Sequence, residues 1–285
     1  TDKLAKTYLG MIYSAQFKFD EAEKVLKSVL TKDYKNPVVH NTLGIVYYQK
    51  ALLSKADAEK YYNSALVEFD TAIKLLPSFH EAYTNAGKVL QDMGNIDQVE
   101  IYFRKALSIQ PNDSDSLEAL GTVFFQKNMA DAAIEQYIKA INVNKKNPTA
   151  YFHLGEAYID KGDYDKAIKY LQNSLFIFPN SSIVHEMLGK AYELKGNNVA
   201  AITEYKKAVL IKSDYIEPYL KLADLYQKQG KDDLAIIELK NAVAKNPEYT
   251  EGLLKIAEIS MNNQNYDQAI KYYKNILSNN NFETI

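Results

Sequence analysis

The 285-residue chain contains no cysteine and no tryptophan, and Arg104 is its only arginine. Without cysteine it can form neither a disulfide, nor a thiolate metal site, nor a cysteine nucleophile. Its net charge of −2 leaves no basic surplus to hold a phosphate backbone, so nucleic acid is not an expected partner. The hydrophobic and charged fractions, 47% and 25%, are those of a globular protein rather than a disordered one.

Long apolar segments are also missing. No run approaches the roughly 18 apolar residues of a membrane helix, and residues 1–6 do not have the charged-then-apolar pattern that begins a signal peptide. These absences predict a soluble chain with no membrane insertion, and they favour the cytoplasm over secretion while leaving the compartment open. Because the sequence does not begin with methionine, we expect a processed chain or a piece of a longer protein.

The spacings that catalytic and cofactor sites require are not found either. Two His-Glu pairs, at 80–81 and 185–186, would begin a zinc-binding helix motif, but Thr84 and Gly189 stand where its second histidine would be. The sequence has no Gly-x-Gly for a dinucleotide loop and no Gly-Lys-Ser/Thr for a phosphate loop. We therefore expect no catalytic residue, no metal and no cofactor in this chain.

What the sequence does contain is an internal repeat with a period of 34 residues. The segment that begins at Pro148 carries an aromatic, a Leu-Gly pair, a second aromatic and a later alanine, and shifts of 34 residues find similar residues again. One step, from Gly44 to Gly87, is 43 residues, so one repeat is nine residues longer. Residues at the same position of successive repeats form a column, and the column of the later alanine is the most regular: Ala65, Val99, Ala133, Ala167, Ala201, Ala235 and Ala269.

Each repeat has the apolar spacing of two amphipathic helices, with a break between them. Asp163 is placed to cap a second helix, and the prolines lie at the junctions between repeats, where they can begin a helix. The breaks carry residues that tolerate the left-handed conformation: Gly94, Asn128, Gly162, Gly196 and Gly230.

The pattern Tyr-x-x-Leu-Gly-x-x-Tyr, followed by Ala-x-x-x-Tyr/Phe and a late proline, resembles the tetratricopeptide repeat (TPR) family. The resemblance implies an all-α fold, a right-handed superhelical α-solenoid of eight helix-turn-helix units. Its first helices would line a concave groove, and its second helices would form the convex back. We expect one solenoid domain over residues 3–283, with repeats 3–36, 37–79, 80–113, 114–147, 148–181, 182–215, 216–249 and 250–283.

The nine additional residues are expected within residues 49–60. This stretch is rich in helix-forming residues and contains neither glycine nor proline. It therefore predicts a longer helix pair in the second repeat, which would offer Leu52 and Leu53 as a contact surface.

In the family, positions 2, 5, 9, 12 and 13 of each first helix face the groove. In repeats one and two these positions are apolar or uncharged, and Met11, Ile45 and Tyr48 would form a secondary apolar groove. In repeats three to eight acidic residues outnumber basic ones at these positions. Some of the acids lie in the first turn of a helix, where they stabilise the helix dipole by about 0.3–1 kcal/mol without any ligand. A bias remains after these are set aside, and a ligand and ordinary solvation both stay open as its cause.

We predict that the groove of repeats four to six binds a protein or peptide segment that carries lysine or arginine together with apolar side chains. Apolar anchors and carboxylates alternate at its positions: Glu118, Phe125, Phe152, Glu156, Ile159, Asp160, Glu186 and Glu193. The basic clamp of chaperone-binding relatives and the asparagine ladder of sugar-transferring relatives are both missing.

The predicted function is a non-catalytic scaffold that holds a peptide or a partner-protein segment in its groove. Two alternatives stay open. The repeats could be the substrate-selecting arm of a larger, glycosyltransferase-like enzyme whose catalytic domain is not in this sequence. They could also form a structural scaffold that self-associates through uncapped ends, because Leu4, Leu9 and Ile12 begin the first helix without a covering segment.

Overall fold

The computed structural model describes residues 2–279, and this part of the chain contains helices and no strand. The chain divides into two compact units, residues 1–147 and 148–285. The helices of the first unit are α1 (Asp2–Ala15), α2 (Phe19–Leu30), α3 (Pro37–Leu53), α4 (Ala58–Leu75), α5 (His80–Asp92), α6 (Ile96–Ile109), α7 (Ser114–Gln126) and α8 (Ala130–Val143). Those of the second are α9 (Pro148–Asp160), α10 (Tyr164–Ile177), α11 (Ser182–Leu194), α12 (Asn198–Ile211), α13 (Ile216–Lys228), α14 (Asp232–Lys245), α15 (Thr250–Asn262) and α16 (Tyr266–Asn279).

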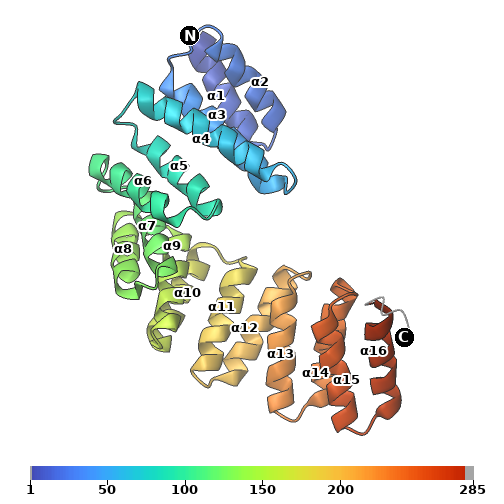
Figure 1. The fold of residues 1–285 in the computed structure, drawn as a ribbon. Helices are drawn as coiled ribbons and strands as arrows, with labels where there is room; N and C mark the ends of the chain where they lie inside the picture. The colour runs from blue at the N-terminus through green and yellow to red at the C-terminus, as the bar shows by residue number, and fades with distance from the viewer. Residues whose placement is uncertain (1, 280–285) are drawn as a thin grey trace. The chain divides into compact units, whose positions relative to one another are not determined.

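Within each unit the helices form antiparallel pairs that stack in chain order. Each first helix packs against its own second helix, as α11 does against α12, and each second helix packs against the next first helix, as α12 does against α13. Figure 1 shows this order in α11 to α16, where each helix lies beside the one that follows it. The predicted all-α class of stacked helix pairs is confirmed. The single domain over residues 3–283 stays a prediction, and residues 280–283 of its last repeat lie outside the described residues.

The turn inside a repeat is set by one residue in the left-handed conformation. Gly94, Gly162, Gly196 and Gly230 have φ between 69° and 86°, and Asn128 has φ 58°, as their positions predict. The carboxylate of Asp163 accepts a hydrogen bond from the backbone N–H of Lys166 at 3.2 Å, which caps α10. The sequence gives no such signal for two further residues with φ 60° and 59° at the same turn position: Phe17 and Gln264.

The core depends on close approach between the two helices of a repeat. Glycines in the first helices face large, fully buried side chains of the second helices, as Gly189 faces Tyr205. A Cβ built on Gly189 would lie 2.7 Å from a ring carbon of Tyr205, closer than real Cβ atoms come. The alanine column is fully buried in the same interfaces, with Ala167 and Ala201 both at 0% exposure. Small residues at these positions therefore fix how closely the helices of a pair approach.

The second repeat has the longest helices of the chain's described part. Helix α3 has 17 residues and α4 has 18, whereas the helices of the other repeats have 12 to 14. Residues 54–57 connect α3 and α4. The predicted lengthening of this pair is confirmed, and Leu52 and Leu53, 55% and 69% exposed, lie at the end of α3.

Candidate partner-binding surface

The eight residues of the predicted groove divide between the two units. Glu118 and Phe125 lie on α7 of the first unit, and both are half-buried. The other six lie on two first helices of the second unit: Phe152, Glu156, Ile159 and Asp160 on α9, and Glu186 and Glu193 on α11. Since α9 and α11 contact each other, these six belong to one surface.

In the first unit, neighbouring first helices are joined by hydrogen bonds and, between Lys88 of α5 and Asp115 of α7, by an ion pair at 3.3 Å. Ser14 of α1 donates to the side-chain oxygen of Gln49 of α3 at 2.5 Å, and the Tyr48 hydroxyl of α3 donates to Asp92 of α5 at 2.7 Å. Burial, with the Asp92 bond, raises the pKa of Tyr48 well above its ordinary value. The secondary apolar residues Met11, Ile45 and Tyr48 are all half-buried within this unit. Two of the three, Ile45 and Tyr48, pack against its core.

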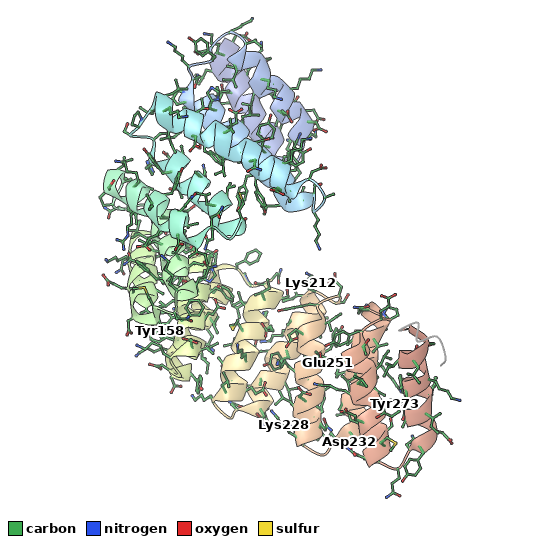
Figure 2. The ribbon with its side chains drawn as sticks, in the orientation of Figure 1. Tyr158, Lys212, Lys228, Asp232, Glu251 and Tyr273 are labelled. Atoms are coloured by element: carbon green, nitrogen blue, oxygen red, sulfur yellow. The ribbon has the colours of Figure 1, made fainter. Side chains whose placement is uncertain are left out.

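Half of the acidic residues on the first helices of the second unit form ion pairs with lysines of the same surface. Glu193 of α11 forms an ion pair with Lys228 of α13 at 3.0 Å, and it also accepts a hydrogen bond from the Tyr205 hydroxyl at 3.0 Å. Asp224 of α13 pairs with Lys255 of α15 at 2.8 Å. Figure 2 labels Lys228 at the end of α13. The acidic bias seen in the sequence is therefore largely neutralised on α13 and α15.

Two lysines that form ion pairs with these acids lie at the sixth position of their first helices. That position is not among the groove positions, so the groove pattern did not indicate them. Lys221 of α13 lies 3.3 Å from the carboxylate of Glu217, and Lys255 lies 2.8 Å from Asp224 and 3.8 Å from Glu251. Both lysines appear in the sequence at the same column, one position beyond the predicted groove position 5. Their long side chains extend across the helix surface to the acids.

Three carboxylates on α9 and α11 differ because no lysine or arginine of the described chain forms an ion pair with them. The Glu156 carboxylate lies 3.3 Å from Nδ1 of His153, and its side chain is 31% exposed. Asp160 ends α9 and is exposed. Glu186 is 8% exposed, and the hydroxyl of Tyr215 donates to it at 3.5 Å.

Glu186 is the most unusual of these groups. Burial raises its pKa above the ordinary value, and the nearby Glu217 acts in the same direction against the opposing effects of Lys190 and Lys221. Burial and the two carboxylates also raise the pKa of Tyr215 to about 12, which keeps its hydroxyl protonated and able to donate. A buried carboxylate with a single long hydrogen bond is electrostatically costly to keep ionised.

An apolar hollow of about 180 Å³ lies between the starts of α9 and α11. Phe152, Ile183 and Val184 line it together with Phe178 from the segment before α11. Ile183 and Phe178 are 54% and 56% exposed, so both offer apolar surface at this hollow. Phe178 was not a predicted site residue, because it lies outside the helices that the family's groove positions describe.

Ile159 does not belong to this exposed surface. It is 9% exposed and lies in a core cluster with Ala167, Leu171 and Leu188. Its expected role as an apolar anchor is not supported by this placement, because α11 and α10 cover its side chain. The apolar part of the candidate surface is thus the hollow at Phe152, Phe178 and Ile183.

Comparisons with known proteins agree with the repeat architecture. Family models described as TPR repeat or tetratricopeptide repeat match residues 121–159 and 194–230, 148–181, 80–113 and 220–283, together more than half of the chain. The chain belongs to the tetratricopeptide repeat family. TPR repeats serve generally as scaffolds for protein–protein interaction, and TPR proteins bind protein partners. A comparison of this TPR chain with curated proteins gives no significant match.

Solved structures resemble this TPR chain at low sequence identity. The crystal structure of MamA has 25% identity and a TM-score of 0.53, over 58% of this chain and 96% of MamA. PilF of Pseudomonas aeruginosa has 23% identity and a TM-score of 0.61, over 70% of this chain and 90% of PilF. IFIT1 in complex with Gppp-AAAA has 17% identity and a TM-score of 0.65, over 90% of this chain and 67% of IFIT1. The likenesses to PilF and IFIT1 show the fold alone.

The described residues lack two further kinds of site. No group of three or more histidine, cysteine, aspartate or glutamate side chains among residues 2–279 could hold a metal ion. In the same part of the chain, each helix is too short or too polar to span a lipid bilayer.

Proposed function

We propose that the surface formed by α9 and α11 binds a partner-protein segment that carries lysine or arginine close to a large apolar side chain. The observation that carries this proposal is the buried carboxylate of Glu186, with which no lysine of the described residues forms an ion pair, whereas Glu193 on the same helix has such a partner. Cationic groups of a partner would supply the missing charge at Glu186, Glu156 and Asp160.

The apolar hollow supports the second half of the proposal. Phe152 precedes Glu156 by four residues, and Ile183 precedes Glu186 by three, so each apolar residue lies on the same helix face as a carboxylate. The two kinds of group are thus about 5–6 Å apart along each helix. In an extended peptide, side chains two residues apart point the same way and are about 6.6 Å apart. We therefore infer a ligand in which lysine or arginine stands two residues from leucine, isoleucine or phenylalanine.

Charge on this surface also supports a protein ligand over a nucleic acid. The three carboxylates that lack a lysine partner would repel phosphate groups, and the lysines of α13 and α15 are already engaged by Glu193, Asp224 and Glu251. A phosphate backbone is bound by clusters of lysine and arginine side chains, whereas α9 and α11 together carry one lysine, Lys190, against four carboxylates.

Selection of peptides from a random displayed library by the 285-residue chain would identify a ligand. The proposal predicts enrichment of sequences with lysine or arginine two residues from a large apolar residue. A selected peptide is then measured against a triple variant, Glu156→Gln, Asp160→Asn and Glu186→Gln. We expect about tenfold weaker binding, and a shallower dependence of affinity on salt, because each charge contact contributes about 0–1 kcal/mol.

A matched control loses the same number of charges elsewhere on the second unit: Glu217→Gln, Asp232→Asn and Glu251→Gln. Figure 2 shows Asp232 and Glu251, two of the three control positions. Two of these acids, Glu217 and Glu251, are paired with lysines, so the control should leave peptide affinity nearly unchanged. Equal affinity and equal salt dependence for the two triple variants would contradict the proposal. The ligand would then dock elsewhere, with the apolar groove of Met11, Ile45 and Tyr48 as the next surface to test.

A further inference from the structure

The junctions between successive repeats are formed by buried apolar side chains at the same positions of each repeat. In the second unit, Ile236 and Leu239 of α14 pack in one cluster with Ile256 and Ile259 of α15, and all four are 9% exposed or less. The same columns meet one repeat earlier, where Tyr205 of α12 packs with the corresponding residues of α13, Leu222 and Leu225.

The first unit uses the same columns. Leu26 of α2 lies in one cluster with Leu43 and Val46 of α3, and their exposures are 0 to 1%. At these junctions an apolar stripe of a second helix, which we name the donor face, packs against an apolar stripe of the next first helix, which we name the receiving face.

The last helix carries a donor face that the described chain leaves uncovered. Ile270 and Tyr273 of α16 occupy the columns of Ile236 and Leu239, but they are 50% and 37% exposed. Leu277, one turn further along, is 58% exposed. Figure 2 shows Tyr273 on α16, at the end of the stack that α11 to α16 form.

The first helix carries the complementary receiving face, also uncovered. Leu9 and Ile12 of α1 occupy the columns of Leu43 and Val46, but they are 38% and 53% exposed. Leu4 and Tyr8 extend this face, with exposures of 60% and 57%. A contiguous apolar stripe on a helix surface is a typical sign of an interface.

We propose that two copies of this chain associate head to tail, with α16 of one copy packed against α1 of the next. The occupant is inferred from continuity with the internal junctions, because residues at the repeat positions of Ile270 and Tyr273 pack elsewhere in the chain with residues at the repeat positions of Leu9 and Ile12. The contact joins two different surfaces, so a dimer keeps one free α1 face on one copy and one free α16 face on the other. Association therefore continues from dimers to longer, concentration-dependent oligomers unless the rotation between copies closes a ring.

Sedimentation velocity of the 285-residue chain over a concentration series tests this proposal. We expect the weight-average mass to rise with concentration above the 32.4 kDa of a single chain. Two single variants, Ile270→Glu in the donor face and Ile12→Glu in the receiving face, should each stay monomeric when alone. Both changes are at exposed positions, so the helical circular dichroism should be retained. Ile101→Glu, at a position of α6 that is 67% exposed, is the control and should associate like the unchanged chain.

Mixing the two variants gives the sharpest result. Each copy of Ile12→Glu still has an intact α16 face, and each copy of Ile270→Glu still has an intact α1 face. The mixture should therefore form a dimer of one copy of each variant and nothing larger. A monomeric unchanged chain at all concentrations would overturn the proposal, and it would indicate that these faces meet another partner or further repeats. Association of Ile12→Glu alone would also overturn it, because that result requires a contact that does not use the α1 face.

Discussion

The contact between Gly189 and Tyr205 gives a prediction whose magnitude follows from the structure. A Cβ at position 189 would lie 2.7 Å from a ring carbon of Tyr205, whereas carbon atoms pack best at about 3.5–4.0 Å. The ring has no room to move, because it is fully buried and its hydroxyl is bonded to Glu193 at 3.0 Å. Overpacking of this kind costs about 1–3 kcal/mol, and the better helix propensity of alanine offsets about 1 kcal/mol of it. We expect Gly189→Ala to destabilise the protein by about 1 kcal/mol.

The seventh repeat supplies the control, because it has Ala223 and Leu239 at the same two columns. In a Tyr205→Leu background, Gly189→Ala should therefore be neutral, or stabilising by up to about 1 kcal/mol. Urea denaturation of the two single variants and the double variant measures this change of sign as a coupling free energy. If Gly189→Ala leaves the denaturation midpoint of the Tyr205 protein unchanged or raises it, the inferred close approach of the two helices is wrong.

Three further predictions concern the core and the charged groups of the second unit. Ala167→Leu should lower the free energy of unfolding by about 1–3 kcal/mol through overpacking, and an unchanged denaturation midpoint would show that the residue is not at a close helix contact. Glu186→Gln should raise the melting temperature at pH 7, because a neutral amide avoids the cost of burying a negative charge, the same cost that raises the pKa of Glu186. Below about pH 4 the carboxyl group is protonated in both the folded and the unfolded protein, so the gain should vanish there. A gain that persists below about pH 4 would contradict this role of Glu186. Burial opposes ionisation of Glu204, yet its bonds to His185 and Lys207 lower its pKa overall, so its contribution to stability is present above about pH 4.5 and is lost as the pH falls below it. A Glu204→Gln variant should therefore lose less stability between pH 5 and about pH 3 than the unchanged protein, and equal losses would contradict this role.

Much of the fold follows from the period of the sequence. The 34-residue spacing places Gly162 and Gly196 at the turns and Ala167 and Ala201 at the helix contacts, and these residue types have few alternatives at such positions. Phe17 adopts the same left-handed turn conformation, with φ 60°, without being glycine or asparagine. Local propensity could not have predicted that residue.

The candidate surface was less predictable, because side-chain reach and burial depend on neighbouring helices. Groove positions taken from the family correctly place Glu156 and Glu186 on adjacent first helices. They do not indicate that Lys255 would extend to Asp224, or that Ile159 would be covered by packing against α11. Both outcomes depend on the distance between helices in three dimensions, which the repeat pattern alone does not give.

The measurement that tests the central claim most directly is a map of where a selected peptide lies on the protein. A photoreactive group next to the peptide's lysine or arginine is cross-linked to the 285-residue chain, and the attachment point is found by mass spectrometry. We predict attachment on α9 or α11, close to Glu156, Asp160 or Glu186, and loss of that product in the triple variant. Attachment confined to α1, α3 or α5, unchanged in the triple variant, would contradict the claim that the carboxylates of α9 and α11 bind the partner.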